Sequence, residues 1–199
     1  MRLRHAILAG GATFFSATTG AASSAPDPFY DPDGWSLTGF AGVMTDNVWE
    51  ESIQPWETEF LDSYLIGLGL RRDWPVAGSN RYFIGIEGQT VAHFGDQTHL
   101  EFNAPVVLSY RPQGRWSGPV DALSFGLGLS YASEIPQTEI NRDGASQRLM
   151  IYWMAEVAVP GPIAQSEVLF RLHHRSDGFG LFEENSGSNA LTIGIRRSF

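Results

Sequence analysis

The chain has 199 residues, which is enough for one ordinary domain, and it has no cysteine. Disulfides, thiolate catalysis and cysteine-ligated metals are therefore excluded. The formal net charge is −9, and phosphate binding needs an excess of positive charge, so nucleic acid is not expected as a partner.

The first residues have the composition of a secretory signal peptide. A charged start with two arginines precedes a mostly small and apolar stretch over residues 6–19, and small residues at 21–25 offer a cleavage site. Glycine and threonine dilute the apolar stretch, which favours a signal peptide over a short membrane anchor. We predict a signal peptide over residues 1–25 and a single domain over 26–199.

Eight later stretches alternate apolar and polar side chains. This period of two predicts strands with two different faces. The stretches lie near residues 35–43, 60–71, 81–94, 99–110, 122–131, 148–159, 167–176 and 189–199. Breaks are predicted at 72–75, 112–114 and 160–162, and longer polar loops over 45–57, 133–146 and 177–188.

This pattern predicts an all-β protein, an eight-stranded antiparallel outer-membrane β-barrel. The signal peptide, the even number of strands and strands of about ten residues, as a tilted crossing requires, all favour the membrane. Aromatic residues near strand ends are typical of the girdles at the two membrane interfaces. They are Trp35, Tyr64, Tyr82, Tyr110, Tyr131 and Phe199. A lipocalin-like or other soluble barrel has the same alternation and is the alternative.

The seventh strand ends with two polar side chains on its apolar face. Phe170, Leu172, His174 and Ser176 share that face. A polar side chain that faces hydrocarbon without a partner costs roughly 2–7 kcal/mol, and a contact between His174 and Ser176 would reduce this cost. A histidine beside a serine can also act as the base that makes the hydroxyl a nucleophile.

The end of the chain resembles the lipid A 3-O-deacylase (PagL-like) family. The resemblance rests on Arg171-x-x-His174-x-Ser176, a polar loop with Asn185-x-Gly187, and a closing strand that ends in Phe199. It implies an eight-stranded outer-membrane barrel that removes an ester-linked acyl chain from lipid A without a cofactor. His174 would be the general base and Ser176 the nucleophile.

Two positions depart from the family pattern. Asn189 stands where the family has its third catalytic member, a glutamate; an asparagine can still orient an imidazole. The alternative is that Glu183 or Glu184 folds back and supplies the carboxylate, although a position in a solvated loop is favoured for both residues. Asp177 stands where the family has an asparagine that helps hold the oxyanion. Because a carboxylate repels an oxyanion, backbone N–H groups of residues 178–180 are the expected donors.

The remaining expectations concern ligands and partners. Arg175, Asp177 and Gly178 are predicted to bind substrate, with Arg175 at the lipid A phosphates. The alternative for Arg175 is that it only balances Asp143, Asp177 and the loop glutamates. The spacing of His93 and His99 fits no standard zinc pattern, so no metal is predicted.

The expected partners are lipopolysaccharide in the outer leaflet and the outer membrane, and the sequence leaves a homodimer open. The alternative function is that of a non-enzymatic small outer-membrane barrel that serves structure, adhesion or lipid binding.

Overall fold

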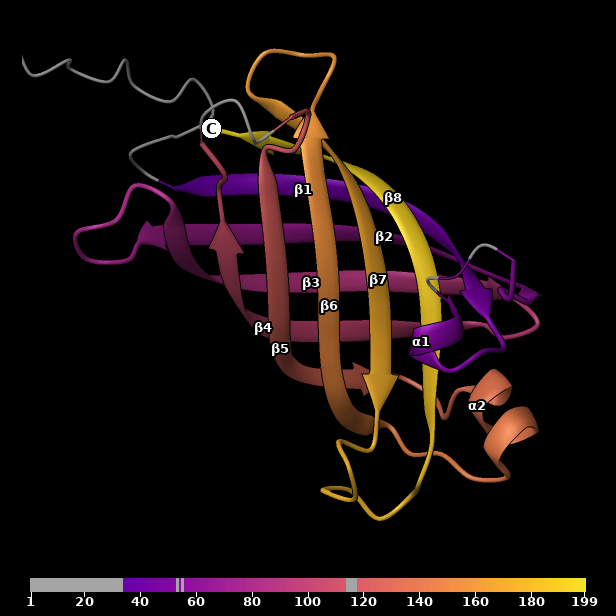
Figure 1. Ribbon diagram of the computed structural model, residues 1–199. Coiled ribbons are helices and arrows are strands. Elements are labelled where there is room, and N and C mark those ends of the chain that lie inside the picture. Colours follow the sequence, from indigo (N-terminus) through magenta and orange to yellow (C-terminus); the bar gives the residue numbers. More distant parts are fainter. Residues whose placement is uncertain (1–33, 53, 55, 114–117) are drawn as a thin grey trace, which may run out of the picture.

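Eight antiparallel strands close into one barrel in which each strand pairs with the next and β8 pairs with β1 (Figure 1). The computed structural model describes residues 34–52, 54, 56–113 and 118–199, so the predicted signal peptide lies outside the described residues. The strands are β1 (Trp35–Thr45), β2 (Phe60–Pro75), β3 (Tyr82–Gly95), β4 (His99–Tyr110), β5 (Ala122–Ala132), β6 (Leu149–Pro160), β7 (Ser166–Ser176) and β8 (Gly187–Ser198). The predicted all-β barrel is confirmed.

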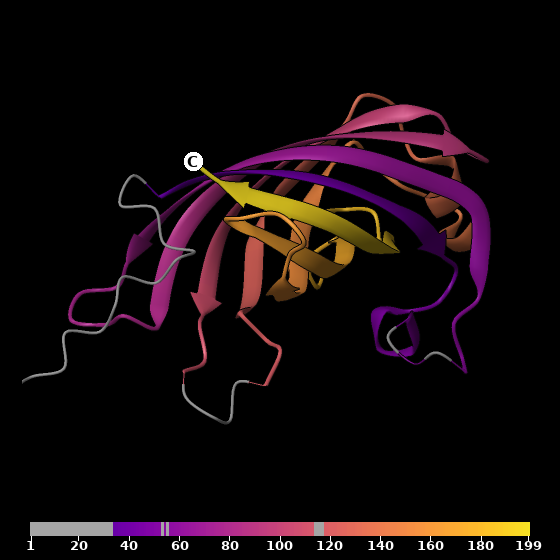
Figure 2. The ribbon, with the colours of Figure 1, turned by 90° about the horizontal axis from the view of Figure 1, so that it is seen from above.

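The two ends of the barrel differ in structure. Two short helices, α1 (Trp49–Ser52) and α2 (Gln137–Asp143), and the β7–β8 loop lie at one end, which we call the helix end (Figure 1). The start of β1 and the end of β8 lie at the other, the terminal end, and the view from above shows the same separation (Figure 2). No helix among the described residues has the length and apolar character needed to cross a membrane.

The barrel is apolar outside and charged inside. On β7, Phe170 points outward and is 52% exposed, whereas its neighbour Arg171 points into the lumen and is 3% exposed. Further large apolar side chains are exposed around the wall: Leu68, Ile84, Leu108, Phe125, Leu127 and Ile193. A soluble barrel buries its apolar face inside, so this arrangement contradicts the lipocalin-like alternative and fits strands that face lipid.

Ion pairs fill the lumen toward the terminal end. Glu156 accepts hydrogen bonds from Arg171 at 2.7 Å and from Arg196 at 2.6 Å, one on each carboxylate oxygen. Arg171 also reaches Glu87 at 3.1 Å. Arg171, Arg196 and Glu156 therefore face inward, and this part of the lumen is packed with side chains, as in other eight-stranded barrels.

One predicted break is wrong. Residues 72–75 continue β2, and the chain turns only at 76–81, where Gly78 has a φ of +75°. Asp73 keeps the strand going because its backbone N–H donates to the carbonyl of Gly34 at 2.9 Å. Pro75 is tolerated because it is the last strand residue, where a missing N–H interrupts little of the ladder.

The longer polar loops that the sequence predicts are present at the helix end, but they are partly helical. Residues 45–57 contain α1, and residues 133–146 contain α2.

Candidate active site

Three neighbouring strands place one side chain each in a row on the outward face, near the helix end. His174 of β7 lies directly opposite Trp153 of β6 and Asn189 of β8. Side chains directly opposite each other on adjacent strands are close enough to interact. Strand pairing therefore brings together two residues that the sequence placed in one site, His174 and Asn189.

Asn189 orients the imidazole of His174. The Oδ1 of Asn189 lies 2.6 Å from the Nδ1 of His174. An amide oxygen can only accept, so Nδ1 carries the hydrogen, and Nε2 of the neutral ring is left as a base. Neither Glu183 nor Glu184 makes a hydrogen bond or ion pair with His174, so within the described residues the orienting partner is the asparagine.

The same amide holds the β1–β2 loop. The Nδ2 of Asn189 donates to the backbone carbonyl of Asn47 at 2.7 Å. A carboxylate has no hydrogen to donate at that position, so a glutamate or aspartate could not make both contacts. The double contact gives a physical reason for an amide at residue 189.

Tryptophans cover the imidazole from outside. The ring of Trp153 lies 4.5 Å from that of His174, centroid to centroid, and Trp49 of α1 meets Trp153 edge-on at 5.7 Å. As a result His174 is only 8% exposed, although it points away from the lumen. Trp49 and Asn47 could not be predicted as site residues from the sequence, because nothing local in the chain shows that the β1–β2 loop folds onto β6–β8.

Ser176 is the next outward-facing residue after His174 on β7, and it lies closer to the helix end. It pairs with Ile151 and Gly187, and the predicted outward register is confirmed. Its Oγ accepts a hydrogen bond from the backbone N–H of Gly178 at 3.4 Å, and within the described residues it makes none with His174. Gly187 allows the two strands to approach closely here, since a Cβ on this glycine would lie 2.5 Å from the backbone oxygen of Arg175 and 3.2 Å from the Cβ of Ser176.

The segment after Ser176 forms a tight left-handed turn. Gly178, Phe179 and Gly180 have φ values of 69°, 61° and 83°. The carboxylate of Asp177 accepts from the N–H of Gly180 at 2.6 Å, so its charge is held within the turn. Of the three N–H groups predicted to hold an oxyanion, only that of Phe179 makes no hydrogen bond among the described residues.

Arg175 does not lie where the sequence analysis placed its substrate contact. It points into the lumen, is 1% exposed, and pairs with Glu139 of α2 at 3.1 Å. Its guanidinium also donates to the backbone carbonyls of Gln147 and Arg148. Since these partners occupy its donors, Arg175 ties α2 and the β5–β6 loop to the barrel rather than reaching lipid phosphates.

The helix α2 also fixes the start of β8. The carboxylate of Asp143 accepts from the Ser186 hydroxyl at 2.9 Å and from the Gly187 N–H at 3.1 Å, and Arg142 donates to the Gly187 carbonyl. Partial burial raises the pKa of Asp143, but the hydrogen bonds from Arg142 and Ser186 outweigh it and lower the pKa below its ordinary range. The glycine beside Ser176 is thus held by an ionised carboxylate.

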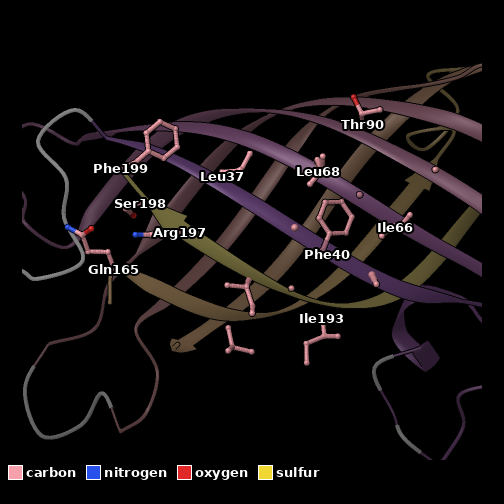
Figure 3. Close-up of a pocket in the computed structure, with 17 residues that line it drawn as sticks. Leu37, Phe40, Ile66, Leu68, Thr90, Gln165, Ile193, Arg197, Ser198 and Phe199 are labelled. Atoms are coloured by element: carbon pink, nitrogen blue, oxygen red, sulfur yellow. The ribbon is translucent and has the colours of Figure 1, made fainter. Parts of the chain in front are cut away.

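An apolar hollow of about 1270 Å³ lies on the outward face over β1, β2 and β8 (Figure 3). Gly39 and Ala41 leave space there, and Leu68, Ile193 and Phe199 stand around it. The hollow does not include His174, Ser176 or Asn189, and it lies further toward the terminal end along β8. It is an outward-facing apolar depression separate from the candidate active site.

Comparison with known proteins supports the fold. No protein-family model matches the chain, and no curated protein matches it. Among solved structures, the outer membrane enzyme PagL is similar, with a TM-score of 0.56 and 14% identity over 82% of this chain and 99% of PagL. Neisserial surface protein A (NspA) gives a TM-score of 0.47 and 11% identity over 83% of this chain and 97% of its own. At this identity the likeness to PagL shows the fold alone, an eight-stranded barrel of the outer-membrane type.

Proposed function

We propose that this protein is an outer-membrane esterase that releases an ester-linked acyl chain from lipid A. The observation that carries the proposal is the 2.6 Å contact between His174 and Asn189, on the outward face, with Ser176 next along the same face. In this proposal the helix end lies at the outer surface and the terminal end in the periplasm, as barrels with short periplasmic turns and longer outer loops prefer.

The chemistry follows from the orientation of the imidazole. Nε2 of His174 takes the proton of the Ser176 hydroxyl as Oγ attacks the ester carbonyl. The tetrahedral intermediate collapses to an acyl-enzyme, and the imidazolium gives its proton to the departing sugar hydroxyl. Water, activated by the same histidine, then releases the fatty acid. The free N–H of Phe179 is the donor best placed by sequence and turn to meet the oxyanion.

The outward direction of the site favours a lipid substrate. His174 and Ser176 lie on the face of β7 that also carries the exposed Phe170. A water-soluble ester would have to leave water to reach this face, whereas the ester of a lipid near its headgroup is already at this depth. Ser176 has no hydrogen bond with His174 before substrate binds, and catalytic hydrogen bonds are often long or misaligned in free enzymes.

A non-enzymatic barrel is the second candidate. The missing contact between Ser176 and His174, together with an amide in place of the family's glutamate, favours it. In that case Asn189 and the two tryptophans only satisfy and cover a polar residue at the membrane surface.

Mass spectrometry of lipid A from a Gram-negative host that expresses the chain separates the two candidates. Ser176→Ala is the test variant. Ser36→Ala is the matched control, because the Ser36 hydroxyl is buried in the lumen without a hydrogen-bond partner among the described residues. Loss of one acyl chain with the wild type and Ser36→Ala, but not with Ser176→Ala, is expected. Unchanged lipid A with a folded, inserted wild-type barrel would refute the esterase.

A further inference from the structure

A second group of reactive side chains lies inside the barrel, near the helix end. His93 of β3 and His99 of β4 are cross-strand partners with stacked rings, 4.2 Å apart and 9° from parallel. Glu101 is the next inward residue of β4, and all three are buried. One ligand atom from each lies within 4.8 Å of the other two. We propose that His93, His99 and Glu101 bind a divalent transition metal ion, with zinc as the best fit.

The donor set selects the class of metal. Two imidazoles and one carboxylate suit zinc and its first-row neighbours, whereas magnesium and calcium prefer oxygen ligands alone. Zinc bonds of about 2.0–2.1 Å place tetrahedral ligands about 3.3 Å apart. No spacing among the three ligand atoms exceeds 4.8 Å, so the side chains close by at most about 1.5 Å, and Nε2 of His93 already lies 2.8 Å from Oε2 of Glu101. A water molecule from the helix end takes the fourth position.

The surroundings of Glu101 and His93 match those of metal ligands, which are usually held by a second layer of hydrogen bonds. One oxygen of Glu101 faces His93 at 2.8 Å, and the other accepts from Ser130 at 2.9 Å and contacts His173 at 3.1 Å. The second oxygen keeps these partners when the first binds a metal. The free nitrogen of His93, Nδ1, contacts Gln97 at 3.3 Å.

His99 is the residue that the hydrogen-bond network leaves unexplained. Its side chain is 8% exposed, yet among the described residues it makes no hydrogen bond. Its ring nitrogens are not among the buried polar atoms without a partner, so water or an ion can reach them. A metal ion shared with His93 and Glu101 would bind this imidazole, and this gives a reason for a histidine stacked on another histidine at this place.

The proposal is independent of the esterase reaction, because the three residues face the lumen and His174 faces outward. The test uses the full chain purified in detergent without a polyhistidine tag and stripped with a chelator. Cobalt(II) is then titrated in, and the visible absorption bands of tetrahedral cobalt are followed. Zinc is added afterwards as a competitor.

His99→Ala is the test variant, since no hydrogen bond is lost with this side chain. His174→Ala is the matched control, because it removes a histidine outside the group. One equivalent of cobalt with visible bands, displaced by zinc, is expected for the wild type and His174→Ala, with binding at least tenfold weaker for His99→Ala. Folding of each variant is checked by its heat-modifiable migration on gels.

Two results would overturn the proposal. The first is a folded wild type that shows no tetrahedral cobalt bands at micromolar protein. The second is a folded His99→Ala that binds cobalt as tightly as the wild type. If His99→Ala does not fold, His99→Gln, which keeps bulk and polarity at this position, is tested under the same two criteria.

Discussion

Substitution of Asn189 by alanine tests the proposed catalytic arrangement most directly. It removes the oxygen that lies 2.6 Å from Nδ1 of His174 and the N–H that holds the Asn47 carbonyl at 2.7 Å. The imidazole then loses the group that fixes its tautomer. A ring that carries its hydrogen on Nε2 cannot take the proton of Ser176.

The size of the effect follows from the lost hydrogen bond. A buried donor left without its acceptor costs about 1–3 kcal/mol. Because 1.36 kcal/mol corresponds to a factor of ten in rate, kcat is expected to fall by roughly 5- to 150-fold. KM should change little, since the amide faces the histidine and the β1–β2 loop and not the bound lipid.

The assay is the single-turnover release of fatty acid from lipid A by the purified barrel in detergent, with Ser176→Ala as the baseline. Asn189→Asp is the companion variant. It keeps the acceptor for His174 but sets an oxygen against the Asn47 carbonyl, so it should retain more activity than Asn189→Ala while loosening the loop. A rate for Asn189→Ala within twofold of the wild type would show that the contact has no catalytic role.

Three further predictions follow from contacts around the site and in the lumen. Since the folded pKa of Asp143 lies below its ordinary 3.8, its stabilising contacts are present above that value and are lost as the pH falls through the folded pKa. The hydrogen-exchange protection factor of the Gly187 amide should therefore fall in acid, and in Asp143→Asn it should be low at neutral pH as well. Arg171→Met leaves the buried carboxylate of Glu87 without its cation and Glu156 with Arg196 alone, and it should lower the free energy of unfolding by about 3–5 kcal/mol, measured by urea titration. Gly187→Ala places a Cβ 2.5 Å from the backbone oxygen of Arg175 and 3.2 Å from the Cβ of Ser176, so the backbone at Ser176 must shift; among molecules that keep heat-modifiable folding, acyl release should slow more than tenfold in the same single-turnover assay.

Strand faces could be predicted from the sequence, because the alternation that decides them is local. The outward position of Ser176 and the lumen position of Arg175 follow from counting along β7. What Arg175 binds does not follow, because its partner Glu139 belongs to a helix in another loop. The predicted break at residues 72–75 is wrong because the local sequence is typical of a turn. Only the pairing with β3 shows that β2 continues there.

Contacts between loops and strands could not be predicted from the sequence either, because the partners belong to segments that are far apart in the chain. Asn47 reaches Asn189 only because β1 and β8 are neighbours in the closed barrel. Likewise, the six-residue spacing of His93 and His99 matches no metal motif, although a hairpin places the two directly opposite each other. The pairing register of the two strands creates that cluster. A rule based only on the spacing of ligands along the sequence does not include this register.

The position of Asn189 on the last strand has a consequence for biogenesis. β8 pairs on one side with β7 and on the other with β1, where Asn189 lies opposite Thr45. The β7–β8 hairpin already places Asn189 beside His174, but until the β1–β8 seam forms the β1–β2 loop has no anchor on Asn189. The amide of Asn189 therefore makes both of its hydrogen bonds only in the closed barrel, and the proposed site is complete only after closure.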